Sequence, residues 1–318
     1  MDGDQLKQRL WDLGHFRNPE MPTGVETLDD ALKLPLTSAE MKTAVHSYQD
    51  YLRADLDHFS LEEHGRLATA DGDLGPATER LFSLPRCGFP DYPVPGLALA
   101  ATKLESNWPT ACRGKLKFGY NFANAPGLSA EDTRRAFVGA VNNWNYALSD
   151  MTLTVQDGTK GADIWAGLKR LAGSTLAWSY LAQDTCNTRL EQRYDSGRRW
   201  ELDYLLTVAT HELGHALGFS HNRDGSALMY PSIHRHSLAR RGYPNSTDLS
   251  VARSNGYTLS GTEPPALDDL YRPMPHDPAP PPPGPQPPDG GMRFVGEFEL
   301  FEGNSSRGKF IIIPKPEV

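Results

Sequence analysis

Three cysteines in 318 residues are too few for a disulfide-built scaffold, so the chain must rely on hydrophobic cores. Its 38% of hydrophobic residues can fill such cores, but no run of about 18 apolar residues exists to cross a membrane. The formal net charge of −8 argues against a general nucleic-acid binder. The length exceeds that of one small domain and predicts two domains with tails.

A secretory leader is also missing at the start. Met1 to Asp4 contains neither a basic segment nor an apolar core. We therefore expect either that a leader was trimmed from this sequence or that export works differently. Glycosylation sequons at Asn245 and Asn304 are consistent with a secretory route.

The most informative stretch runs from Thr207 to Pro231. It holds the pattern H-E-x-x-H-x-x-G-x-x-H, formed by His211, Glu212, His215, Gly218 and His221. Residues four apart share one face of a helix, so the first two imidazoles lie side by side and suit a zinc ion. The glycine can take a left-handed conformation that ends the helix and lets the third imidazole approach. Three protein ligands leave one position for a water, whose proton the glutamate can take.

A plain amphipathic helix with solvent-facing histidines is the alternative to this metal site. Five fixed positions occur together, and Met229 follows eight residues after the third histidine. That methionine fits the Met-turn found beneath the zinc of a metzincin. The combination favours a catalytic zinc site.

A second motif lies more than a hundred residues upstream and reads Pro-Arg-Cys-Gly-Phe-Pro-Asp from Pro85 to Asp91. It resembles the cysteine switch of matrix metalloproteinases. Together the two motifs give roughly residues 5 to 240 a resemblance to matrixin zymogens. The resemblance implies that Cys87 occupies the fourth zinc position while Arg86 and Asp91 form an ion pair. A thiolate is a strong zinc ligand and would displace the catalytic water.

The resemblance implies an α+β chain, with a small helical-bundle prodomain before a zincin-like catalytic domain that has a mixed twisted sheet and two long helices. We expect the prodomain at 1–95, the catalytic domain at 96–273, a Pro-rich linker at 274–292 and a short β segment at 293–318. Apolar spacing predicts three prodomain helices, at 5–13, 38–56 and from Pro76 onward.

The catalytic part begins with a predicted strand at 116–120. Further strands are predicted at 151–155 and from Ala162, and a long helix after the capping box at Ser129. The zinc motif lies on a predicted helix at 200–217. Residues 173–177 resemble the edge strand above the metzincin cleft, where a substrate backbone would pair.

One catalytic zinc is the expected cofactor. Animal matrix metalloproteinases carry a second, structural zinc, but residues 160–200 of this chain contain no histidine. Trp178 stands where a family histidine would follow, so we expect no second zinc. Asp184, Glu191 and Asp195 are the remaining calcium candidates, although a solvated loop is the better interpretation.

If Cys87 is the switch, Cys112 and Cys186 remain as a candidate disulfide pair. Two buried free thiols are the alternative, which an intracellular chain would prefer. A bridge would act as a staple in place of the lost structural metal.

The resemblance also assigns the substrate pocket and its surroundings. Pocket residues would be Thr207, Ala177, Pro231 and Ile233. His234 and His236 are interpreted as surface loop residues. The family braces its Met-turn with an Asp-Asp pair, for which Asp268 and Asp269 are the candidates.

These features predict a secreted, monomeric zinc endopeptidase that cleaves extracellular proteins or peptides and stays latent until an activating protease cuts within residues 97–107. No nucleic-acid or membrane partner is expected. The alternative is a cell-wall or glycan-binding protein, because residues 72–78 also resemble bacterial peptidoglycan-binding modules. The switch motif directly after them favours the inhibitory role.

Overall fold

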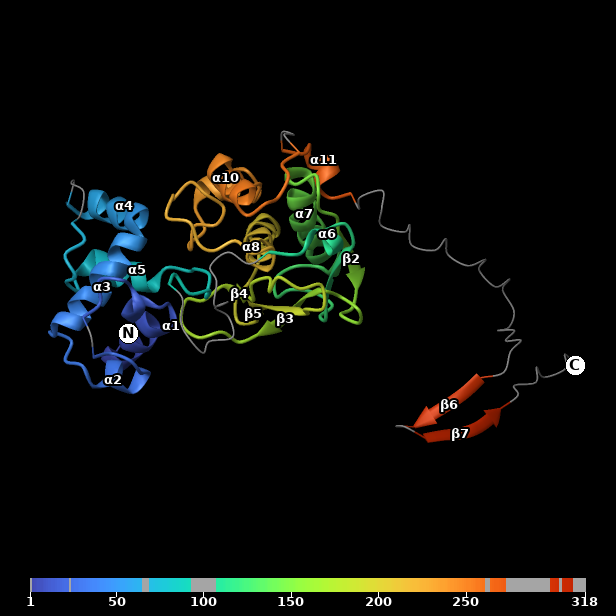
Figure 1. Ribbon diagram of the computed structural model, residues 1–318, viewed down its shortest axis with the longest axis horizontal. Coiled ribbons are helices and arrows are strands. Elements are labelled where there is room, and N and C mark those ends of the chain that lie inside the picture. Colours follow the sequence, from blue (N-terminus) through green and yellow to red (C-terminus); the bar gives the residue numbers. More distant parts are fainter. Residues whose placement is uncertain are drawn as a thin grey trace, which may run out of the picture. The chain divides into compact units, whose positions relative to one another are not determined.

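The computed structural model describes residues 2–22, 24–64, 69–92, 107–260, 264–272, 298–302 and 305–310. The chain divides into two units, residues 1–277 and 278–318 (Figure 1). Most of the expected cleavage stretch, the Pro-rich linker and the sequon at Asn304 lie outside the described residues. The predicted domain boundaries therefore remain predictions.

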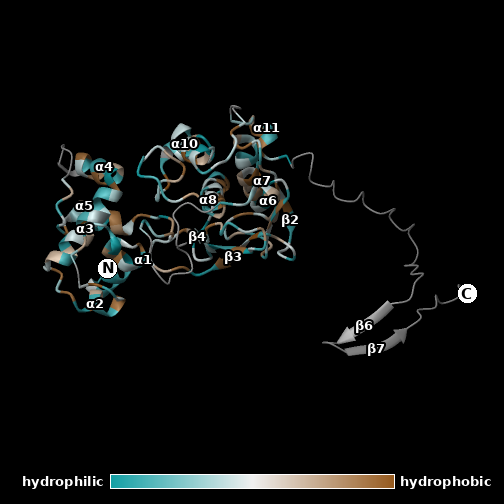
Figure 2. Cartoon of the chain, viewed as in Figure 1, coloured by the Kyte–Doolittle hydropathy of each residue, from teal (hydrophilic) through white to brown (hydrophobic). Residues whose placement is uncertain are grey.

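The first part of the larger unit is a bundle of helices, called here the N-terminal bundle. It comprises α1 (Gly3–Asp12), η1 (His15–Arg17), α2 (Leu28–Lys33), α3 (Ala39–Tyr51), α4 (Arg53–His64) and α5 (Pro76–Ser83). Side-chain caps from Asp2, Thr27 and Ser38 start α1, α2 and α3. Figure 2 shows hydrophobic and hydrophilic residues on the same helices, as expected for a bundle around one core.

The prediction of three bundle helices was wrong. The predicted helix at 38–56 is interrupted at Leu52, whose backbone (φ −98°, ψ 37°) leaves the helical region, and the chain continues as α4. Leu52 is buried in the bundle core, so tertiary packing fixes this break.

The second part carries a five-stranded mixed sheet, and the α+β prediction is confirmed. Its strands are β1 (Leu116–Tyr120), β2 (Leu153–Asp157), β3 (Ile164–Lys169), β4 (Ala177–Ser179) and β5 (Leu190–Asp195), in the order β2-β1-β3-β5-β4. The pairs are parallel except β4 with β5, which leaves β4 as an antiparallel edge strand. The helices are α6 (Thr110–Arg113), α7 (Ala130–Ala147), α8 (Leu202–Ala216), α9 (Arg235–Ala239), α10 (Ser246–Ser254) and α11 (Leu267–Leu270).

Helices α7 and α8 pack against each other on the same side of the sheet (Figure 1). A Cβ on Gly139 of α7 would collide with Leu206 of α8, so the glycine permits the close approach. Trp144 is fully buried between them and donates its indole N–H to the Thr210 carbonyl oxygen at 2.8 Å. These contacts hold the helix that carries two of the predicted ligands.

A disulfide joins Cys112 in α6 to Cys186 in the loop before β5, with a Cα–Cα distance of 5.7 Å. The bridge closes a loop of 74 residues, which in the chain-entropy treatment stabilises the fold by roughly 4 kcal/mol. Cys87 remains a free, buried thiol.

The smaller unit contains an antiparallel pair, β6 (Phe298–Glu302) and β7 (Ser305–Phe310). Their register shifts between Glu299 and Phe301, as in a β-bulge. Over the described residues of both units, no helix combines the length and the hydropathy needed to cross a bilayer.

Candidate metal centre

Helix α8 positions the first two predicted ligands. His211 and His215 are both buried, and their ring centroids lie 4.8 Å apart. Gly218 has a φ of 102°, a left-handed value that favours glycine, and it follows the last residues of the helix. The chain then turns back, so that the His221 ring lies 5.4 Å and 4.9 Å from the other two rings.

The two helical imidazoles are oriented by carbonyl oxygens of the same part of the chain. His211 Nδ1 lies 2.8 Å from the Leu228 oxygen, and His215 Nδ1 lies 2.6 Å from the Phe219 oxygen. A carbonyl oxygen only accepts, so each Nδ1 carries the proton and each Nε2 lone pair is left for another partner.

His221 is oriented by a carboxylate from the upstream segment instead. Its Nδ1 lies 2.8 Å from Asp91 Oδ1, and neither side chain is exposed. Arg86 Nη2 donates to the same oxygen, and His15 Nε2 bonds to Asp91 Oδ2 at 2.9 Å. Burial alone would raise the pKa of Asp91, but Arg86 and the two imidazoles hold it well below its usual value.

Cys87 completes the cluster from the same segment. Its Sγ lies 3.5 Å from His215 Nε2, and the four candidate ligand atoms lie within 4.8 Å of one another. Burial raises the pKa of the Cys87 thiol, so a thiolate at this position requires a neighbouring cation. The Nε2 atoms of His211 and His221 are buried without a hydrogen-bond partner in the described part of the chain. Orphaned imidazole nitrogens beside a thiol are a donor set that fits zinc.

Glu212 lies next to the first ligand and is fully buried. Neither carboxylate oxygen meets hydrogen-bond geometry with a described group. Burial raises the pKa of Glu212 to about 8. A carboxyl group held in this way is available for proton transfer.

Met229 supports the cluster from below. Its sulfur packs so closely on Gly214, between the two helical ligands, that a Cβ at that glycine would collide with it. The backbone N–H groups of Leu228 and Met229 donate to the Asp248 carboxylate at 2.8 Å and 3.0 Å. The brace is therefore Asp248.

The prediction that Asp268 and Asp269 brace the turn was wrong, because both lie in α11, which packs on α7, and the N–H groups of the turn donate to Asp248 instead. Asp248 carried a local signal that the sequence analysis did not use. It is the third helical residue of a capping box that begins at Asn245. The Asn245 amide also donates to Ser226 Oγ at 3.1 Å, so the sequon at this position is engaged in the fold.

The segment from Pro85 to Asp91, called here the switch segment, lies between the sheet edge and the wall at Pro231. Cys87 N–H donates to the Pro231 oxygen at 2.9 Å, and Gly88 N–H donates to the Ala177 oxygen at 2.8 Å. Arg86 pairs in parallel with Thr175 and antiparallel with Ser232. The switch segment thus uses hydrogen-bonding groups on both sides of the cleft.

The other predicted pocket residues are Ile233, two residues after Pro231, and Thr207 on α8. Ile233 lines a cavity of about 670 Å³ between the wall and α4. Thr207 is buried, and its hydroxyl donates to the Asp203 carbonyl oxygen one turn earlier. His234 is more than a surface residue, because its Nε2 lies 3.1 Å from the buried Asp55 of α4.

The calcium candidates do not gather into a site within the described residues, where the cluster at Cys87 is the one group of three or more metal-binding side chains. Asp184 accepts a hydrogen bond from Asn107, and Asp195 accepts from the backbone of Leu171 and Gly197. Glu191 pairs with Arg193.

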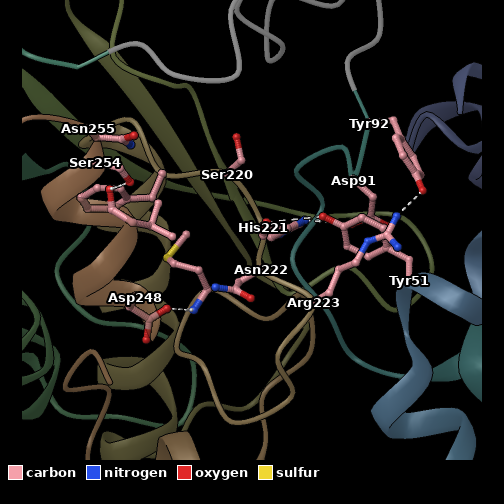
Figure 3. A pocket seen from close by; sticks show the side chains of 13 residues that line it. Tyr51, Asp91, Tyr92, Ser220, His221, Asn222, Arg223, Asp248, Ser254 and Asn255 are labelled. Carbon is pink, nitrogen blue, oxygen red and sulfur yellow. Dashed lines mark hydrogen bonds and ion pairs between the residues drawn. The ribbon is translucent and has the colours of Figure 1, made fainter. Parts of the chain in front are cut away.

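A second cavity, of about 390 Å³, lies beside His221 (Figure 3). Arg223 reaches from the ligand loop toward the bundle there and bonds to Tyr92 Oη at 2.6 Å and to Asp50 at 2.9 Å. Its guanidinium also lies 4.8 Å from the Tyr51 ring centroid. Side chains from the upstream part of the chain and from the loop after α8 therefore meet beside His221.

Comparison with known proteins identifies the second part of the unit. Residues 112–248 match the family model of matrixin, the M10 peptidases. The chain is 27% identical over 176 residues to matrix metalloproteinase-20 of Homo sapiens, which is 51% of this chain and 34% of that protein. It is 32% identical over 171 residues to interstitial collagenase of Sus scrofa, at 49% and 34% coverage.

A plant relative, metalloendoproteinase 4-MMP of Arabidopsis thaliana, is 27% identical over 181 residues, at 47% of this chain and 50% of the relative. The chain therefore spans between a third and a half of the length of these curated relatives. Residues 112–248 therefore form a matrixin domain.

Proposed function

We propose that the chain is a zinc-dependent endopeptidase that acts on extracellular proteins and is made in a latent form. One observation carries the proposal. Three imidazoles, two of them with Nε2 atoms that have no hydrogen-bond partner among the described residues, converge beside the buried carboxyl group of Glu212 and the sulfur of Cys87. Membership of the matrixin family over the same residues supports the zinc and the peptidase activity.

The imidazoles of His211, His215 and His221 would hold the metal. When bound, zinc supplies a Lewis acid that polarises the scissile carbonyl and lowers the pKa of a water toward about 7. Glu212 takes the proton of the attacking water and delivers it to the leaving nitrogen. The Ala177 and Pro231 carbonyl oxygens, which accept from the switch segment now, would accept from the substrate backbone.

Latency follows from the same contacts. Cys87 Sγ lies against the ligand cluster, and the backbone around it occupies both sides of the cleft. The N-terminal bundle adds contacts through Arg9, which donates to Ser174 and Thr175 on the edge segment. These contacts favour an inhibitory role for the bundle over a wall-binding one.

The test of the activity is the variant Glu212→Ala. After activation we expect it to retain stoichiometric zinc and to lose peptide cleavage by at least about 100-fold, because the proton-transfer group is gone. Glu201→Ala, at the exposed start of the same helix, is the matched control. Cleavage is measured by mass spectrometry of a digested peptide library, with and without chelator. Strong cleavage by the Glu212 variant would refute the assigned role.

Latency is tested by Cys87→Ser. A hydroxyl is a poor substitute for a thiolate on zinc, so we expect this protein to process itself during expression. If its latency matched that of the wild type, contacts other than the sulfur would be doing the inhibiting.

A further inference from the structure

We propose that Asp91 is a positioning residue for the third metal ligand. The segment removed on activation would then supply part of the outer shell that holds the metal, as well as the sulfur that blocks it. This inference rests on the proposed function, because it requires the imidazole cluster to bind zinc.

The contact between Asp91 and His221 carries the inference. In Figure 3 the two side chains point toward each other, and Asp91 Oδ1 lies 2.8 Å from His221 Nδ1 with both side chains unexposed. An ionised carboxylate only accepts, so this contact fixes the imidazole tautomer that leaves Nε2 free for a metal. Carboxylate partners of this kind orient a ligating histidine and make it more basic.

Asp91 is itself held in one place. Its second oxygen bonds to His15 Nε2 at 2.9 Å, and His15 Nδ1 lies 3.0 Å from Ser47 Oγ. Its backbone N–H donates to the Leu13 oxygen at 2.9 Å. Arg86 supplies the opposite charge from the same segment. Apart from His221 itself, these groups that fix the carboxylate are therefore upstream of the expected cleavage stretch.

Loss of the upstream segment affects the three ligands unequally. His211 and His215 keep their carbonyl acceptors, which belong to Leu228 and Phe219. His221 loses the carboxylate described above. Removal of an outer-shell partner typically weakens metal binding about 10–100-fold. Cleavage should therefore lower the zinc affinity by more than the loss of the Cys87 ligand alone explains.

The experiment measures zinc affinity of the full chain by competition with a chelator, in a Glu212→Ala background that prevents self-cleavage. Asp91→Asn is compared with its parent twice, once with Cys87 present and once with Cys87→Ser. We expect about a tenfold loss of affinity in both backgrounds, because the outer-shell role does not depend on the sulfur. The ligand-field absorption of the cobalt-loaded chain should change in parallel. No effect in the Cys87→Ser background would overturn the inference, since Asp91 would then act only by docking the sulfur.

Two further variants guard against a general folding defect. His15→Gln retains a side-chain N–H that can donate to Asp91, and we expect near-normal affinity, whereas His15→Leu should lose several-fold. Asp50→Asn removes an exposed contact to Arg223 and should leave the affinity unchanged. Equal losses in Asp50→Asn and Asp91→Asn would overturn the inference, because any loosening of the bundle would then suffice.

The outcomes separate this inference from the proposed function. If the wild-type chain binds no zinc, the proposed function fails and the inference fails with it. If the chain binds zinc and cleaves peptides after activation while the Asp91 and His15 variants bind zinc normally, only the inference fails.

Discussion

The helical and loop parts of the metal cluster are built in different ways. His211 and His215 stand on one helix and are oriented by carbonyl oxygens from the matrixin domain. His221 stands on a loop and is oriented by Asp91, which comes from the upstream segment. The difference teaches that candidate ligands can lie within one domain while one of the groups that orient them comes from a segment upstream of that domain.

The largest effect is expected when the metal is removed, and it tests the comparison between the helical and loop ligands. When free zinc exceeds its Kd ten-thousandfold, binding stabilises the fold by about 5.5 kcal/mol, which a chelator would remove. We expect the amides at 220–222 to gain hydrogen exchange more than those at 210–214, because α8 is held by packing on α7. The measurements are chemical unfolding and exchange mass spectrometry. Equal gains in both stretches would contradict the comparison.

The next largest effect is expected for Arg86→Met. This change leaves the buried Asp91 without its guanidinium partner, which costs about 3–5 kcal/mol of docking free energy. The protein should therefore gain peptidase activity without an activator. The rate of cleavage of a fluorogenic peptide measures this activity. Arg134→Met removes an exposed ion pair on the matrixin domain and is the control. Preserved latency in the Arg86 variant would show that the pair is dispensable.

Asp248→Ala tests support that stays with the mature domain. It leaves the N–H groups of Leu228 and Met229 without their acceptor, so we expect a loss of about 3 kcal/mol in the free energy of unfolding. Asp248 stays in the chain after the expected cut, so this loss in unfolding free energy should persist after processing. The effect of Asp91 on zinc affinity should be confined to the uncleaved chain. Asp269→Ala is the matched control, and denaturant unfolding is the measurement. A larger effect at Asp269 would restore the brace expected from the sequence.

The smallest effect is expected for Arg223→Gln. Arg223 and Asp50 are each about half exposed, so their ion pair contributes only about 0.5 kcal/mol to docking of the bundle. Added salt should erase the difference from wild type. Activation rates at low and high ionic strength provide the measurement, and a large effect that resists salt would show that this surface contact rivals the buried one.

The sequence could bring the candidate ligands together because their geometry is local. Helical spacing pairs His211 with His215, and the need for a left-handed residue explains Gly218. The fold class also followed from the motifs. His15 could not be found in this way, because it lies 76 residues from Asp91 and a single histidine after a helix has no distinctive pattern.

Two secondary-structure errors have a physical cause. The break at Leu52 between α3 and α4 is set by packing in the bundle core, which apolar periodicity does not reveal. Strand β5 was not predicted, because Gln192 occupies a fully buried position where alternation calls for an apolar residue. Its amide donates to Ser179 on the neighbouring strand β4, and its carbonyl oxygen accepts from the Tyr194 hydroxyl on β5 itself.

The disulfide has a consequence for the fate of the N-terminal bundle and the switch segment after a cut. Cys112 and Cys186 both lie downstream of the expected cut, and Cys87 has no covalent partner. A single cut there would therefore turn the chain into a two-piece complex held only by reversible forces. Such a complex obeys mass action, so dilution should separate the two pieces, and an added N-terminal piece should bind the other piece in trans.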